Sequence, residues 1–221
     1  LPVITVAAIM DPEMMEDIIA SGKADVIAIA RSHIADPELP NKAREGRRED
    51  IRPCIGCNQG CIGALKIGRR AGCAVNPQAA REASFDLTPA AVKKNVLVVG
   101  GGVAGMEAAR CAALRGHKVT LCEAGNRLGG NLIPAGAHDF KKELNELNQW
   151  YQRQLKKLDV EIELGAKLDA QAVLYHKPDA VVLAVGAAPV MPKVPGIERE
   201  NVVDCVTALT GKDLPGENIL V

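Results

Sequence analysis

The chain has 221 residues, and its 27 basic and 27 acidic side chains give a formal net charge of zero. With no positive excess and only two Phe, two Tyr and one Trp, it lacks the charge and the stacking surfaces that nucleic-acid binding needs. The length excludes a complete eight-stranded α/β barrel beside another domain. No apolar run approaches the roughly 18 residues of a membrane span, and no signal peptide opens the chain, so we expect a cytoplasmic protein without a membrane partner.

The hydrophobic pattern predicts two regions that are joined by a linker at residues 81–94. The first region opens with a strand, a helix and a strand at residues 3–9, 11–21 and 24–30. A short charged helix at 40–48 and a glycine-rich stretch of loops and short turns follow it. In the second region, strands at 95–99, 118–123, 160–164 and 179–185 alternate with helices at 104–115, within 139–157, and at 169–176. This alternation predicts an α/β fold with a parallel sheet, and the apolar residues 219–221, which follow a Pro-Gly segment at 215–218, have the pattern of the start of one more strand.

Seven cysteines are an odd number, and in a reducing compartment they do not indicate a disulfide framework. Four of them fall within 20 residues with the spacing CxxCxxxCx11C, at Cys54, Cys57, Cys61 and Cys73. We expect the remaining three, Cys111, Cys122 and Cys205, to be small buried hydrophobic residues.

The four clustered cysteines have the chemistry of metal ligands. Thiolates two and three residues apart on a glycine-rich loop can converge on one inorganic core, which a fourth cysteine then closes. Structural zinc usually takes its ligands from two close pairs, whereas three close cysteines and one distant one favour a [4Fe-4S] cluster. Zinc stays the alternative at this point.

A dinucleotide-binding pattern lies at the start of the second region. Gly100, Gly102 and Gly105 form GxGxxG directly after a predicted strand and at the start of a predicted helix. Such glycines permit the tight turn, the close approach of a pyrophosphate and the packing of the helix on the strand. Glu123 ends the next strand, where a carboxylate can accept hydrogen bonds from ribose hydroxyls.

Two further segments favour FAD over NAD as the dinucleotide. EAGNRLGG at residues 123–130 resembles the ExxxxxGG extension of FAD proteins of the glutathione-reductase type. AVGAAP at residues 184–189 is similar to the motif at which the chain of those proteins returns past the FAD.

Taken together, these motifs resemble the iron-sulfur flavoenzymes of the old yellow enzyme family, typified by NADPH-dependent 2,4-dienoyl-CoA reductase and trimethylamine dehydrogenase. Residues 53–61 and 73–77 look like the cluster segment, and the motifs at 98–109, 123–130 and 184–189 look like the FAD domain that follows it. Residues 24–46 are similar to the last strand and loop of an FMN-binding TIM barrel. The resemblance thus implies an α/β fold in which a Rossmann-like FAD domain follows a barrel end and a cluster loop.

The resemblance also implies an electron route from NAD(P)H through FAD and the [4Fe-4S] cluster to FMN, which reduces an activated C=C bond of an enoyl-type substrate. By resemblance, Arg31 contacts the FMN phosphate with Ala30 beside it, and the alternative for Arg31 is a surface salt bridge. No catalytic residue is assigned, and the oligomeric state stays open. The positions that the resemblance assigns to FAD are Gly100, Gly102, Val103, Ala104, Gly105, Glu123, Ala124, Arg127, Gly129, Gly130 and Gly186.

These motifs predict a division into the end of a barrel at 1–50, a cluster segment at 51–82, an FAD domain at 95–217 and the start of an NAD(P)H domain at 218–221. We therefore expect an internal piece of a longer oxidoreductase. The alternatives are a free-standing FAD and iron-sulfur electron-transfer module, an amine dehydrogenase of the same architecture, a small NAD enzyme with structural zinc, and a glutamate-synthase-like FAD subunit.

Overall fold

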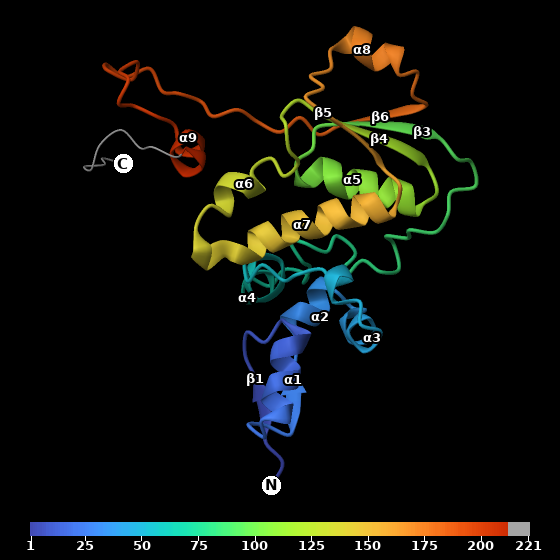
Figure 1. Cartoon of the computed structure of the whole chain (residues 1–221), viewed down its shortest axis with the longest axis vertical. Helices are drawn as coiled ribbons and strands as arrows, with labels where there is room; N and C mark the ends of the chain where they lie inside the picture. Colours follow the sequence, from blue (N-terminus) through green and yellow to red (C-terminus); the bar gives the residue numbers. More distant parts are fainter. Residues whose placement is uncertain (212–221) are drawn as a thin grey trace.

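The computed structural model describes residues 1–211, which form three successive parts of the molecule (Figure 1). A two-stranded unit lies at the N-terminal end, a turn-rich segment follows it, and a four-stranded α/β domain lies beyond. The strand start expected at 219–221 and the domain start expected at 218–221 lie outside the described residues. Within residues 1–211, no helix combines the length and the apolar character needed to cross a bilayer.

The N-terminal unit has the predicted order of strand, helix and strand, with shorter strands than expected. Its elements are β1 (Ile4–Val6), α1 (Pro12–Ala20) and β2 (Val26–Ala28). The two strands pair in parallel, and α1 begins after Asp11, whose carboxylate accepts the first capping hydrogen bond. Ile4 and Val6 on β1 and Val26 on β2 are exposed. A parallel sheet is ordinarily covered on both faces, so this pair leaves apolar surface uncovered.

The turn-rich segment contains more helical structure than predicted. Its elements are α2 (Arg31–Ala35), α3 (Leu39–Arg44), η1 (Arg48–Asp50), the π-helical turn η2 (Gln59–Gly63) and α4 (Ala64–Lys66). The prediction of loops and short turns in the glycine-rich stretch did not specify that η2 and α4 are helical turns. Asn58 adopts a left-handed conformation with a φ of 56°, and its carbonyl accepts a hydrogen bond of 2.7 Å from the Gly63 amide. That bond closes a helical turn in a stretch where the glycines predicted loops and short turns.

The α/β domain confirms the predicted parallel sheet. Its strands are β3 (Asn95–Val99), β4 (Lys118–Glu123), β5 (Glu161–Leu164) and β6 (Ala180–Leu183), in the order β5-β4-β3-β6. The connecting helical elements are α5 (Val103–Leu114), α6 (Leu132–Ala135), η3 (Asp139–Lys141), α7 (Lys142–Lys157) and α8 (Ala170–Tyr175). Helices α5 and α7 lie on one side of the sheet and α8 lies on the other (Figure 1).

The main core lies between the sheet and the helices α5 and α7. It contains Val98, Leu121, Met106 and Leu155, which have no exposed surface. Helix α7 also contacts the turn-rich segment. The Trp150 indole N–H donates to the Asp50 carbonyl over 2.9 Å, and the Gln154 amide donates to the Asp50 carboxylate over 3.1 Å. One helix therefore holds the turn-rich segment against the α/β domain.

The three cysteines outside the cluster of four have different environments. Cys122 on β4 is 1% exposed, as predicted, and burial raises its pKa to about 12. Cys111 on α5 is half-buried, and burial raises its pKa to about 11. The prediction was wrong for Cys205, which is exposed. It begins α9 (Cys205–Thr210), a short helix that buries no residue, so nothing packs over its thiol.

Candidate functional site

The glycine-rich turn after β3 is shaped by close backbone contacts. A Cβ atom on Gly105 would overlap the carbonyl oxygen of Gly100, and one on Gly100 would overlap the carbonyl oxygen of Ala184. Gly102 is different, because its nearest neighbour would be the Gly130 Cα atom at 3.9 Å. Gly100 and Gly105 thus allow the strand, turn and helix to pack. Gly102 keeps open space at the N-terminus of α5.

The N-terminus of α5 has the properties of an anion site. Gly102 is its N-cap and carries no side chain that could cap the first amides of the helix, which begins at Val103 and Ala104. Free amides and the positive end of the helix dipole attract phosphate groups. The open space at Gly102 therefore lies beside free helix amides, an arrangement that suits a pyrophosphate.

The second glycine segment lies directly against the first. The Gly129 amide donates to the Gly101 carbonyl over 2.9 Å, and a Cβ atom on Gly130 would lie 3.0 Å from the Gly102 Cα atom. Asn148 of α7, which the sequence analysis missed, packs so closely on Gly129 that a Cβ atom there would meet its side-chain amide at 2.6 Å. Ala124 and Arg127 are exposed on the loop between the two segments.

Glu123 joins these two segments through its carboxylate. One oxygen accepts a hydrogen bond of 2.6 Å from the Gly101 amide, and the other accepts one of 2.7 Å from the Gly125 amide. Each carboxylate oxygen retains a second lone pair for a further donor. The chain after β6 passes the same turn, because the Ala184 amide donates to the Val99 carbonyl over 2.8 Å. Gly186 follows with a φ of +70° and open space around it.

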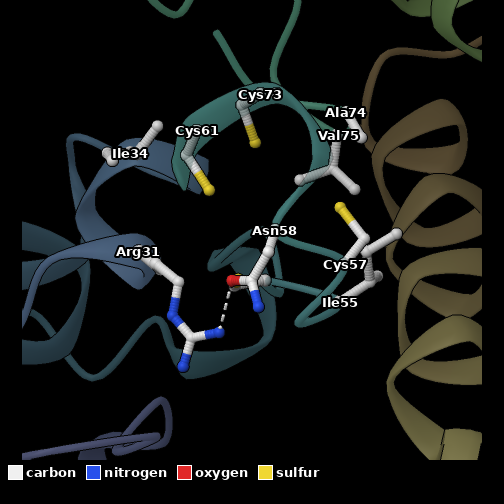
Figure 2. Close-up of a pocket in the computed structure, with 11 residues that line it drawn as sticks. Arg31, Ile34, Ile55, Cys57, Asn58, Cys61, Cys73, Ala74 and Val75 are labelled. Carbon is white, nitrogen blue, oxygen red and sulfur yellow. Dashed lines mark hydrogen bonds between the residues drawn. The ribbon is translucent and has the colours of Figure 1, made fainter. Parts of the chain in front are cut away.

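The four clustered cysteines line a single pocket in the turn-rich segment. Cys54, Cys57, Cys61 and Cys73 share it with Arg31, Asn58 and the apolar side chains Ile34, Ile55 and Val75. The sulfur atoms of Cys57, Cys61 and Cys73 point toward the same space (Figure 2). Burial raises the pKa of Cys54 above its ordinary value, so its thiolate needs a compensating positive charge.

Gly60 explains how the distant Cys73 reaches the other three cysteines. The Gly72 amide donates to the Gly60 carbonyl over 2.6 Å, and a Cβ atom on Gly60 would lie 3.0 Å from the Cys73 backbone. A side chain on residue 60 would therefore push the two segments apart at this point. The π-helical turn η2 then carries Cys61 beside Cys73.

The sulfur atoms of the four cysteines are spaced more widely than the ligands of a single tetrahedral zinc ion. A tetrahedral zinc site with Zn–S bonds of about 2.3 Å places its sulfur atoms about 3.8 Å apart. No three of these four sulfur atoms, all within the described part of the chain, lie within 4.8 Å of one another. Thiolates are also the ligands of iron-sulfur clusters, so the chemistry of the four residues is compatible with a cluster.

Arg31 lies at the edge of the same pocket. It is the first residue of α2, and its guanidinium donates to the Asn58 side-chain oxygen over 2.9 Å (Figure 2). Ala30 precedes it as the N-cap and is exposed. No carboxylate in residues 1–211 forms a salt bridge with Arg31. The alternative of a surface salt bridge is thus not observed within the described residues.

A buried cation connects the cysteine pocket to the α/β domain, and the sequence analysis missed it. Arg52 is 6% exposed, and its guanidinium lies 4.5 Å from the Trp150 ring centroid. It donates to the Val75 carbonyl over 2.8 Å and lies 3.7 Å from the Glu107 carboxylate. Arg52 lies two residues before Cys54, and Val75 lies two residues after Cys73. The Arg52 side chain therefore connects both cysteine-bearing segments to Glu107 on α5 and Trp150 on α7.

A parallel sheet with paired glycine loops at one helix N-terminus defines a dinucleotide-binding α/β protein. The chain belongs to the pyridine nucleotide-disulphide oxidoreductase family, whose model matches residues 94–221. Residues 1–50 match a second family model, NADH:flavin oxidoreductase / NADH oxidase. Together the two matches indicate flavin binding and confirm the resemblance to flavoenzymes of the old yellow enzyme type.

Known proteins resemble the chain over nearly its whole length. It is 42% identical to a cinnamate reductase of Clostridium sporogenes over 221 residues, covering 100% of this chain and 33% of the relative. It is 47% identical to an NADH oxidase of Thermoanaerobacter brockii over 203 residues, covering 91% and 31%. The structure of a 2-naphthoyl-CoA reductase complex matches with a TM-score of 0.93 and 37% identity, covering 97% and 33%. The chain therefore spans about a third of the length of the relatives it matches.

Proposed function

We propose that this chain is the electron-transfer portion of an iron-sulfur flavoprotein oxidoreductase. The protein would take electrons from NAD(P)H and pass them through FAD and a [4Fe-4S] cluster to FMN, for reduction of an activated C=C bond in an enoate or enoyl-CoA. One observation carries the proposal. Arg31, assigned to the FMN phosphate, borders the pocket of the four cysteines, and Arg52 ties that pocket to the dinucleotide-binding domain. The three cofactor sites would thus follow one another along the molecule.

The proposed division of labour follows the three parts of the molecule. Residues 1–50 would end an FMN-binding barrel whose other strands cover β1 and β2, and residues 51–82 would hold the cluster. Residues 95–217 would bind FAD, and an NAD(P)H domain would begin at 218–221. Bound flavins exchange electron pairs with organic substrates, whereas a cluster carries single electrons.

Each group in the chain would have a defined task toward these cofactors. The first amides of α5 would hold the FAD pyrophosphate. The Glu123 carboxylate would accept hydrogen bonds from the ribose hydroxyls, using the lone pairs that are not occupied by the Gly101 and Gly125 amides. Gly129, Gly130 and Gly186 would let the chain pass close to the cofactor. The apolar side chains around the four cysteines would exclude water from the cluster.

The main test compares two cysteine variants of anaerobically purified protein that contains this chain. We expect Cys61→Ser to lose iron, acid-labile sulfide and the broad cluster absorption while it keeps the FAD bands. Its NAD(P)H-driven reduction of cinnamate should fall at least about 100-fold, because single electrons lose their relay. Cys205→Ser is the matched control and should behave like the wild type, since Cys205 lies exposed outside the pocket.

Three results would overturn this proposal. Stoichiometric zinc without iron would support the small NAD enzyme, and unchanged cinnamate reduction by Cys61→Ser would remove the cluster from the electron route. Oxidation of secondary amines in place of cinnamate reduction would support the amine dehydrogenase.

Glu123→Gln tests the FAD site separately from the cluster. A glutamine has one acceptor oxygen where the carboxylate has two, so either the Gly101 or the Gly125 amide loses its partner. We expect the Kd for FAD to rise roughly tenfold, equivalent to about 1.4 kcal/mol. Flavin titration into deflavinated protein measures it, with Glu146→Gln on the exposed side of α7 as the control. An unchanged Kd would argue against a cofactor role for Glu123.

A further inference from the structure

A second group of metal-ligating side chains lies on the face of the sheet opposite α5 and α7. Cys122 on β4 and Glu163 on β5 are direct partners in the register of the two parallel strands, so their side chains share this face. His176 directly follows α8, the helix that lies over this face (Figure 1). Apolar residues around Cys122, among them Leu97, Val99 and Val173, hold α8 against the strands. The fold therefore gathers a thiol, a carboxylate and an imidazole from three different elements.

The distances in this group are close to those of a tetrahedral metal site. The Cys122 Sγ atom lies 3.5 Å from Glu163 Oε2, and His176 Nε2 lies 3.9 Å from the same oxygen. All three ligand atoms lie within 4.8 Å of one another. Zinc with ordinary bond lengths would separate sulfur from oxygen by about 3.5 Å and oxygen from nitrogen by about 3.3 Å. The sulfur-to-oxygen distance already matches such a site, whereas the His176 imidazole has to move closer to both Glu163 and Cys122.

The surroundings leave a path for an ion and a place for a fourth ligand. The side chain of Cys122 is buried beneath the group, whereas the side chains of His176 and Glu163 are 23% and 38% exposed. Water can thus reach the carboxylate and the imidazole from outside. Among the described residues, His176 is the one basic group within 4.0 Å of the Glu163 carboxylate, and at 3.9 Å it forms no hydrogen bond with it. The negative carboxylate therefore lacks a close cation.

We propose that Cys122, Glu163 and His176 bind a divalent cation of the zinc type, with water as the fourth ligand. One thiolate, one imidazole and one carboxylate are the mixed soft and borderline ligands that zinc accepts. On binding, the ion forms a bond to sulfur and the thiol proton leaves to solvent, so no oxidant or reductant takes part. The site is separate from the four-cysteine pocket, because the sheet, α5 and α7 lie between them. An occupied site would join β4, β5 and α8 beside Glu123.

Zinc binding to the flavin- and cluster-loaded protein tests this site. Metal-free buffers and anaerobic conditions keep the four-cysteine pocket filled with its own cluster, and equilibrium dialysis with elemental analysis counts zinc and iron together. We expect about one zinc per chain with the iron content unchanged. X-ray absorption at the zinc edge should show one sulfur neighbour at about 2.3 Å, with nitrogen and oxygen completing the shell.

Matched variants separate this site from other zinc ligands. Cys122→Ser and His176→Gln should each weaken zinc binding at least about 100-fold, whereas Cys111→Ser and His138→Gln, which alter the same residue types outside the group, should not. His176→Gln changes a part-exposed side chain, so it keeps the test valid if the buried Cys122→Ser protein fails to fold. Three results would overturn the proposal. They are a zinc coordination shell of four sulfur atoms, zinc binding by His176→Gln as tight as that of the wild type, and no zinc uptake by the wild type.

Discussion

Gly105→Ala is expected to lower the free energy of unfolding by about 3 kcal/mol and to abolish FAD binding. The added methyl group would overlap the Gly100 carbonyl oxygen, which belongs to the backbone and has no rotamer to adopt. Helix α5 must then move away from β3, although Met106 and Ala109 on that helix are completely buried. The movement would also displace the helix N-terminus. Denaturant unfolding of the flavin-free protein and titration with FAD measure the two effects.

Gly102→Ala is the matched control, because it adds the same methyl group three residues earlier. Its nearest neighbour would be the Gly130 Cα atom at 3.9 Å, which is ordinary contact. We therefore expect an unfolding free energy within about 0.5 kcal/mol of the wild type. FAD binding should be weakened, because the added methyl group fills the open space at the N-terminus of α5. Unimpaired FAD binding by Gly102→Ala would contradict the assignment of this space to the cofactor. Wild-type stability of Gly105→Ala would contradict the packing argument.

Arg52→Ala should destabilise the protein by about 2–3 kcal/mol, the cost typical of leaving a buried acceptor without its donor. The arginine side chain is 7% exposed, and after its loss the Glu107 carboxylate still has Arg110 as a cationic partner. It also removes the donor to the Val75 carbonyl and the group stacked on Trp150. Because Val75 lies close to Cys73, we expect the variant to lose iron during purification. Chemical unfolding and iron analysis of the purified protein measure both results.

Two arginine controls distinguish this effect from a general loss of charge. Arg44→Ala removes an exposed arginine and should change the unfolding free energy by no more than about 0.5 kcal/mol. Arg52→Lys keeps the positive charge without the planar fork, so it should lie between the alanine variant and the wild type. A loss below about 1 kcal/mol for Arg52→Ala would show that the junction between the cysteine pocket and the α/β domain depends on other contacts.

The α/β domain could be predicted closely because its signals are local. The predicted strand bounds at 95–99 and 118–123 coincide with β3 and β4, since apolar residues fill each strand and turn residues end it. The helix within 139–157 was located by its apolar face, which buries Leu147, Trp150, Tyr151 and Leu155. The π-helical turn was missed because it depends on one hydrogen bond around Asn58 rather than on a periodic pattern.

The sequence by itself was enough to predict the residues of the two cofactor sites. The spacing of the four cysteines is contained in one short stretch of sequence. The order of strand, glycines, helix and acid is contained in another, so each pattern can be recognised without the fold. The burial of a side chain is harder to predict, because the spacing of residues does not reveal whether another element covers a helix. Cys205, which was predicted to be buried and is exposed, is an example.

Only the tertiary structure decided how distant residues meet. Gly60 lets Cys73 join the other cysteines, and Arg52 reaches Val75, Glu107 and Trp150 from three other parts of the chain. Cys122 and Glu163 are 41 residues apart and become neighbours through the register of β4 and β5. Such contacts depend on strand pairing and helix packing, which sum weak interactions over the whole domain, so no short segment encodes them.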